Sequence, residues 1–186
     1  MQTLSLTGGF RDAPKDAAFA FRAVMNAMAK PGEINRVTGA EPPVGLSTAA
    51  GVVLLTLCDP ETPLYLAPGF DRPELRDWIT FHTGAPFAPA TAAHFALGAW
   101  DDLPRGDFPL GTAAYPDRSA TLIVEVDDLR RDGAALSGPG IKDKAALSLP
   151  ERAAFQQNAA LFPRGLDFIF TCGDRLAALP RSTKVS

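Results

Sequence analysis

Two cysteines and two histidines are the side chains best suited to bind a metal ion or to act in nucleophilic catalysis. They are far apart, at Cys58, His82, His94 and Cys172, and show no ligand spacing typical of a zinc site. We therefore expect no metal site, and we expect both cysteines to be small hydrophobic side chains of the core. No nucleophile-elbow sequence surrounds Ser47, Ser119 or Cys172. A Cys–His or Ser–His pair that meets only in the folded chain stays open.

The segment Gly138-Pro-Gly-Ile-Lys142 is a candidate anion-binding loop. Its glycines allow backbone N–H groups to approach an anion. However, Pro139 removes one donor, and the segment matches neither the P-loop nor the dinucleotide fingerprint. A tight turn after a strand is the simpler interpretation. Lys142 is kept as a candidate anion contact.

Two arginines lie beside proline corners near the end of the chain. Arg164 follows Pro163, and Arg181 follows Pro180. A guanidinium on a rigid corner loses less entropy when it pairs with an anion or with a partner's carboxylate. We therefore predict that both arginines are docking or anion contacts. Pairing with an aspartate of the same chain, such as Asp167, is an equally good interpretation.

Helices must position these residues. The first is predicted from Pro14 to about Ala29, and Arg22, which lies off its apolar stripe, is a further docking candidate. The stripe expected to face the core comprises Ala17, Phe21, Val24, Met25 and Met28. The segment Ala49–Leu57 is apolar all round, so its periodicity fits a buried helix or a buried strand. Its length and its alanines favour a helix, with Ser47 as the N-cap.

Two capping boxes predict two more helices. Asp71 with Glu74 precedes the stripe of Leu75, Trp78, Ile79 and His82. We expect His82 to be a hydrogen-bonded core histidine. Ser148 with Glu151 precedes the stripe of Phe155, Ala159 and Phe162. This last helix should end at Phe162, because Pro163 cannot continue it and Gly165 suits a left-handed exit.

Short apolar segments between the helices predict strands. They are Glu33–Val37, Thr62–Leu66, His94–Ala99, Ala120–Val126, Ala134–Ser137, Leu166–Cys172 and Arg175–Leu179. Ala120–Val126 should be central in its sheet, and the last two strands should form a hairpin. The irregular region 100–118 is expected to be a binding or packing loop. The sequence thus predicts a single α/β domain over residues 1–186, a mixed sheet with helices on both faces.

The overall composition is that of an ordinary globular protein, with 46% hydrophobic and 21% charged residues. A net charge of −3 favours neither nucleic-acid nor membrane-surface binding. The longest apolar run, Ala49–Cys58, is too short for a bilayer span. The start, Met1–Arg11, shows no secretory signal, and two unpaired cysteines fit a reducing compartment. We therefore expect a cytoplasmic protein.

Several of these segments, taken in order, resemble the PhnH family, the H subunit of the bacterial carbon–phosphorus lyase core complex. The resemblance covers nearly the whole chain. Its motifs are Phe21-Arg-Ala-Val-Met-Asn-Ala-Met28 with Pro31-Gly32, Leu55-Thr-Leu-Cys-Asp59, Ser119-Ala-Thr121, Gly138-Pro-Gly-Ile141, Asn158-Ala-Ala-Leu-Phe-Pro-Arg-Gly-Leu-Asp167 and Leu179-Pro-Arg-Ser-Thr183. Ser182 stands where the family pattern has threonine, and it keeps the hydroxyl.

The resemblance implies a non-catalytic subunit of a complex that also contains the G, I and J subunits. That complex attaches methylphosphonate to the ribose of ATP, with loss of adenine, and forms ribose 1-methylphosphonate 5-triphosphate; it later breaks the carbon–phosphorus bond. The resemblance assigns the nucleosidase chemistry to the I subunit. It further implies a homodimer and a fold similar to the large domain of pyridoxal-phosphate-dependent transferases, without that cofactor. The apolar segment Phe108–Tyr115 is a candidate for the dimer contact.

Two alternatives remain open from the residues themselves. The first is a small-molecule enzyme of the pyridoxal-phosphate type, with Lys142 or Lys144 as the aldimine lysine. The second is a phosphate- or nucleotide-binding module that uses Arg164 and Arg181.

Overall fold

The computed structural model describes residues 6–186, so the predicted absence of a secretory signal lies partly outside the described residues. The four helices of this part of the chain are α1 (Ala13–Ala29), α2 (Thr48–Leu57), α3 (Pro73–Thr83) and α4 (Arg152–Ala160). The strands are β1 (Asn35–Arg36), β2 (Leu64–Leu66), β3 (Phe95–Ala99), β4 (Thr121–Glu125), β5 (Ala134–Ser137), β6 (Ala145–Leu147), β7 (Asp167–Cys172), β8 (Arg175–Leu179) and β9 (Lys184–Val185). No helix within residues 6–186 is long and apolar enough to cross a membrane.

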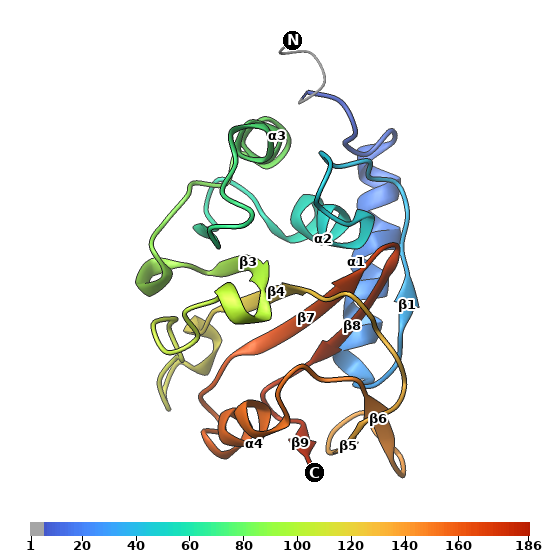
Figure 1. Cartoon of the computed structure of the whole chain (residues 1–186), viewed down its shortest axis with the longest axis vertical. Coiled ribbons are helices and arrows are strands. Elements are labelled where there is room, and N and C mark those ends of the chain that lie inside the picture. The colour runs from blue at the N-terminus through green and yellow to red at the C-terminus, as the bar shows by residue number, and fades with distance from the viewer. Residues whose placement is uncertain (1–5) are drawn as a thin grey trace.

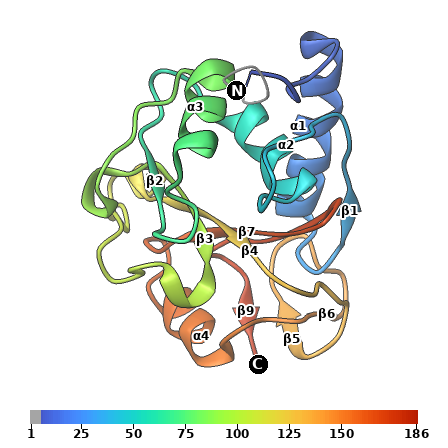
Figure 2. The same ribbon diagram turned by 45° about the horizontal axis from the view of Figure 1, so that its top comes forward.

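Six strands form a mixed sheet in the order β1-β8-β7-β4-β3-β2 (Figure 1; β2 is labelled in Figure 2). Strands β2, β3, β4 and β7 are parallel, whereas β8 and β1 run antiparallel to their neighbours. The predicted central position of the segment around β4 is confirmed, and so is the hairpin of β7 and β8. A second, small antiparallel sheet has the order β6-β5-β9.

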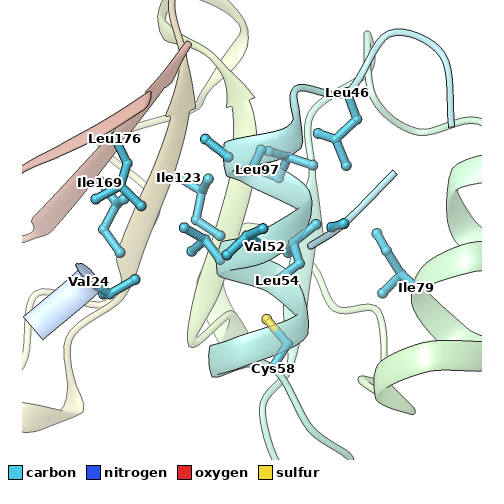
Figure 3. Packing of buried hydrophobic residues seen from close by; sticks show 14 of the residues in the cluster. Val24, Leu46, Val52, Leu54, Cys58, Ile79, Leu97, Ile123, Ile169 and Leu176 are labelled. Carbon is cyan, nitrogen blue, oxygen red and sulfur yellow. The ribbon is translucent and has the colours of Figure 1, made fainter. Parts of the chain in front are cut away.

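The large sheet separates two hydrophobic cores. Helices α1, α2 and α3 lie on one side, and α4 lies with the small sheet on the other (Figure 2). Because side chains alternate along a strand, Ile123 and Ile169 enter the first core while Leu122 and Phe168 enter the second. Figure 3 shows the first core, where Val52 and Leu54 of α2 pack among residues of the sheet and of the neighbouring helices.

Helix α1 turns to the core a face that agrees only in part with the predicted stripe, since Val24 is buried and Met28 packs against the first core. Its buried residues are Ala20, Val24 and Ala27, whereas Phe21 and Met25 of the predicted stripe are 48% and 51% exposed. The core-facing side is thus largely alanine, which allows a helix to approach its neighbours closely. The predicted stripe is therefore correct for Val24 and Met28 and wrong for Phe21 and Met25.

Helix α2 confirms the prediction of a buried helix with Ser47 as its N-cap. The Ser47 hydroxyl accepts a hydrogen bond from the Ala50 N–H at 3.0 Å. All residues from Ala49 to Leu54 are buried. This explains why the segment is apolar all round.

Both predicted capping boxes are wrong. The residue before α3 is Arg72, which makes no side-chain cap, and Asp71 instead pairs with Arg76. The residue before α4 is Glu151, also without a side-chain cap. In both cases the carboxylate that the motif assigns to the helix end forms an ion pair instead, Asp71 with Arg76 and Glu151 with Arg105.

The remaining differences concern short elements. Helix α4 ends at Ala160, and Phe162 is 60% exposed rather than part of a core stripe. Strand β5 pairs with β6 and β9 in the small sheet, and neither of those strands was predicted. Strands of two or three residues are too short to give a periodicity signal.

The irregular region 100–118 packs against the second core. It contains two 3-10 turns, Trp100–Asp102 and Pro116–Arg118. Phe108, which belongs to the segment predicted for a dimer contact, is only 3% exposed. This residue therefore fills the core of its own chain.

Candidate functional site

The corner after α4 is held by a side-chain amide. Asn158 accepts a hydrogen bond from the Leu166 N–H at 2.8 Å and donates one to the Leu166 carbonyl at 2.9 Å. The Gly165 N–H donates to the Leu110 carbonyl at 2.9 Å. Gly165 has φ +125°, and a Cβ there would lie 3.0 Å from the Asn158 side chain, so glycine suits this position. These contacts fix the path of the chain into β7.

Arg181 is bound inside the chain at this corner. Its guanidinium forms an ion pair with Asp167 and donates to the Pro116 carbonyl. The Arg181 N–H also donates to the Asp167 carboxylate, at 2.8 Å. Both charged side chains are only 14% exposed. The structure thus forms the pair with Asp167 that the sequence left open, but with Arg181 rather than Arg164.

Arg164 and Arg22 lie on the surface. Arg164 is exposed at the corner beside the exposed Phe162, and Arg22 is exposed on α1. Within residues 6–186, neither guanidinium takes part in an ion pair or a side-chain hydrogen bond. Both side chains are therefore available to a partner or an anion.

A groove of about 570 Å³ runs beside this corner, between α4 and the irregular region. Its polar wall is a cluster around Trp100, where the Arg105 guanidinium lies 3.9 Å from the centre of the indole ring. Glu151 accepts hydrogen bonds from the Trp100 indole N–H at 3.1 Å and from Arg105 at 3.2 Å. The other walls include Leu103, Leu110, Leu161, Leu166 and Phe168.

A second cavity, of about 420 Å³, lies where the end of α1 meets the loop between β5 and β6. Lys142 lines it, and so does Lys144; both side chains are exposed. The glycine segment Gly138–Ile141 is a turn, in which the Ile141 N–H donates to the Gly138 carbonyl at 3.2 Å.

The cysteines are unpaired. Cys58 is buried, and burial together with the nearby Asp59 raises the pKa of its thiol to about 12. Because the thiolate is the reactive form, Cys58 is chemically inert near neutral pH.

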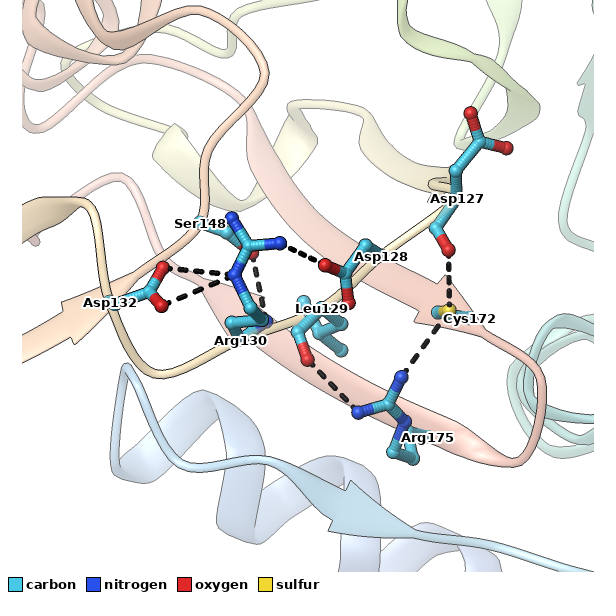
Figure 4. A network of polar contacts seen from close by, with 8 residues as sticks. All are labelled: Asp127, Asp128, Leu129, Arg130, Asp132, Ser148, Cys172 and Arg175. Atoms are coloured by element: carbon cyan, nitrogen blue, oxygen red, sulfur yellow. Dashed lines mark hydrogen bonds and ion pairs between the residues drawn. The ribbon is translucent and has the colours of Figure 1, made fainter.

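Cys172 belongs to a network at the end of β7 (Figure 4). Its thiol donates to the Asp127 carbonyl at 3.4 Å, and Arg175 donates to its sulfur at 3.7 Å and to the Leu129 carbonyl at 3.1 Å. These contacts tie the hairpin to the segment after β4, so the thiol has a structural role.

Glu125, at the carboxyl end of β4, was missed by the sequence analysis. It accepts a hydrogen bond from the Ser47 N–H at 2.7 Å and one from the Thr171 hydroxyl at 3.0 Å. Burial raises the pKa of this carboxyl above its ordinary value, although the hydrogen bonds act in the opposite direction. Glu125 thus joins the start of α2 to two neighbouring strands.

The histidines do not assemble a site. His82 is half-buried and packs against Trp78 with the two rings tilted and their centres 5.0 Å apart, but its Nε2 has no hydrogen-bond partner among residues 6–186. We expected a hydrogen-bonded core histidine, whereas His82 is only half-buried and makes no hydrogen bond through Nε2 within these residues. Over the same residues, no group of three or more His, Cys, Asp or Glu side chains could hold a metal ion.

The geometry defines a class of protein: a mixed α/β fold in which the side chains of Ser47, Cys172 and Glu125 are engaged in structural contacts, with free cations on its surface. Over residues 8–186, the chain matches the family model described as bacterial phosphonate metabolism protein (PhnH). The chain belongs to this PhnH family.

Two curated proteins align with nearly the whole chain. The first is the alpha-D-ribose 1-methylphosphonate 5-triphosphate synthase subunit PhnH of Rhizobium meliloti (strain 1021), 40% identical over 196 residues, which covers 99% of this chain and 97% of that protein. The second is HtxG of Stutzerimonas stutzeri, described as a candidate C-P lyase subunit. It is 28% identical over 198 residues, which covers 96% of this chain and 95% of that protein.

Proposed function

We propose that this protein is a non-catalytic subunit of a carbon–phosphorus lyase core complex. In this role it supports formation of ribose 1-methylphosphonate 5-triphosphate from ATP and methylphosphonate in phosphonate catabolism. Family membership and the name of the Rhizobium meliloti relative support the assignment. The partners proposed are the G, I and J subunits, and the compartment proposed is the cytoplasm.

The exposed corner at Arg164 is the observation that carries a docking role. Asn158 and the Arg181–Asp167 pair hold the backbone of this corner, while Arg164 and Phe162 project from it. Arginine and aromatic side chains are the residues most often found at the energetic centre of protein interfaces. Because the corner is already rigid, little conformational entropy is lost when a partner binds there.

The exposed side of α1 supports the proposed homodimer. Phe19, Phe21 and Met25 are 74%, 48% and 51% exposed, and Arg22 lies among them in the sequence. Phe21 and Met25 are neighbours on the helix surface, because they are four residues apart, and an exposed apolar patch is typical of a protein-contact surface. We therefore assign the dimer contact to α1 in place of the segment Phe108–Tyr115.

The alternative of a pyridoxal-phosphate enzyme is not favoured by the residues around Lys142 and Lys144. Both lysines are exposed on a loop, and the cavity that they line contains no aromatic side chain to stack on a pyridine ring. An aldimine site also needs a partner for the pyridine nitrogen and a phosphate cup. We therefore propose no cofactor. The fold similarity to the large domain of such transferases, and the single domain over residues 1–186, remain proposals that rest on the family resemblance.

Coexpression with the G, I and J subunits tests the docking proposal. The wild-type chain should copurify with them, and Arg164→Ala should copurify at least about fivefold less, while its thermal unfolding is unchanged. The matched control is Arg11→Ala, which removes an exposed arginine in front of α1. A wild-type chain that stays alone would overturn the subunit assignment. Unfolding of the isolated Arg164→Ala chain would show that Arg164 stabilises the fold instead.

A further inference from the structure

The cavity at the end of α1 gathers positive charge from three separate segments of the chain. The Lys30 side chain comes from the end of α1, Arg131 from the segment between β4 and β5, and Lys142 and Lys144 from the loop between β5 and β6. Two carboxylates, Glu33 and Asp143, also line it. We call this feature the basic cleft.

Close backbone packing fixes the two sides of the basic cleft. Gly140 has φ +80°, and a Cβ at this position would lie 1.8 Å from the Ala29 carbonyl oxygen. Gly32 has φ +91°, and a Cβ there would lie 2.7 Å from the Ala145 side chain. The glycines therefore allow the loop to sit directly against the end of α1, where Lys142 and Lys144 line the same cavity as Lys30.

The four cations of the basic cleft are not neutralised by contacts within the chain. Within residues 6–186 none of them forms an ion pair, although two carboxylates are part of the same lining. In contrast, Arg76, Arg130 and Arg181 are each paired with an aspartate. The cleft thus concentrates unpaired positive charge on a chain whose net charge is −3.

We propose that the basic cleft binds a small phosphate-type polyanion, such as pyrophosphate or the polyphosphate part of a larger molecule. Lysine ammonium groups bind phosphates as point charges. Cations on several sides of a concave site raise the local concentration of an anion. The volume of about 420 Å³ is that of a small-molecule pocket. A protein partner would cover a much larger, flatter area.

This site is independent of the proposed docking role of Arg164, because it lies on other elements and binds its ligand in the isolated chain. Failure of the binding test would leave the subunit assignment untouched. Likewise, failure of copurification would leave the cleft intact.

Calorimetric titration of the isolated protein with pyrophosphate, at about 20 mM salt, tests the proposal. We expect saturable binding that weakens at least tenfold when the ionic strength is raised to about 0.5 M, where exposed charges are screened. The double variant Lys142→Ala/Lys144→Ala should weaken binding at least tenfold and keep the wild-type circular dichroism spectrum, since both side chains are exposed.

The matched control is the double variant Arg11→Ala/Lys15→Ala, which removes the same two positive charges at the opposite end of α1. This variant should bind pyrophosphate like the wild type. An isolated wild-type chain that gives no saturable heat with millimolar pyrophosphate would overturn the proposal. Equal weakening by Arg11→Ala/Lys15→Ala would also overturn it, because binding would then follow net charge and not the cleft.

Discussion

Replacing Arg181 by alanine should destabilise the protein far more than the removal of an exposed arginine. The change leaves the Asp167 carboxylate, whose side chain is 14% exposed, without its cation, and it leaves the Pro116 carbonyl without the guanidinium donor. The backbone N–H of residue 181 remains to bind the carboxylate.

The structure sets the size of this effect. Breaking a buried ion pair by removing one partner costs about 3–5 kcal/mol, because the other charge stays buried and unpaired. Since one hydrogen bond to Asp167 survives, we expect a loss near the lower limit, about 3 kcal/mol. For a chain of this length, 1 kcal/mol corresponds to a shift in Tm of about 2–4 °C. The Tm should therefore fall by about 6–12 °C.

Urea unfolding and thermal unfolding of three variants measure this difference. Arg181→Lys keeps the charge but loses the planar fork of donors, so it should recover only part of the stability. The control Arg36→Ala breaks the pair with Asp174, whose side chains are 75% and 42% exposed. Such surface pairs are worth about 0–1 kcal/mol. If Arg181→Ala costs no more than Arg36→Ala, the assignment of Arg181 as an internal strut is wrong.

Two further predictions concern Glu125 and α1. Because the pKa of Glu125 is raised in the folded state, its contribution to stability is present below the unfolded pKa and is lost as pH rises through the folded pKa. The free energy of unfolding of Glu125→Gln, measured relative to wild type by urea titration, should therefore increase from pH 4 to pH 7. A difference that stays constant over this range would refute the buried-carboxylate account. Light scattering should give about twice the chain mass of 19.7 kDa for the wild type, and about one chain mass for Phe19→Ser/Met25→Ser. The control Val44→Ser, at a site 93% exposed elsewhere, should remain a dimer. A wild-type monomer at micromolar concentration would contradict the assigned contact.

The long apolar segments determined most of the fold, and they could be read from the sequence. The centre of strand β4, Leu122–Val124, is apolar because it is covered on both faces, and α2 is apolar all round for the same reason. The face of α1 could not be predicted in this way. Val24 and Met28 of the predicted stripe contact the core, but two alanines pack there too while Phe21 and Met25 remain outside, so residue size predicted the face only in part.

The candidate site was predictable only in part, because its contacts join distant segments. The two proline corners predicted the same role for Arg164 and Arg181. Only the folded chain distinguishes the free guanidinium of Arg164 from that of Arg181, which is bound to Asp167. Lys142 was recognised from the glycine segment. Lys30 and Arg131 line the same cavity as Lys142 only because of the tertiary structure, and no local sequence pattern predicts this arrangement.

The non-catalytic role is tested most directly by assaying the synthase reaction with ATP and methylphosphonate under three conditions. The first contains this chain alone. The second contains the G, I and J subunits with the further components that their reaction requires, and the third contains the same set together with this chain. We predict no ribose 1-methylphosphonate 5-triphosphate from the isolated chain, and a higher rate from the complete set than from the set without this chain. Turnover by the isolated chain, at any rate that scales with its concentration, would contradict the account.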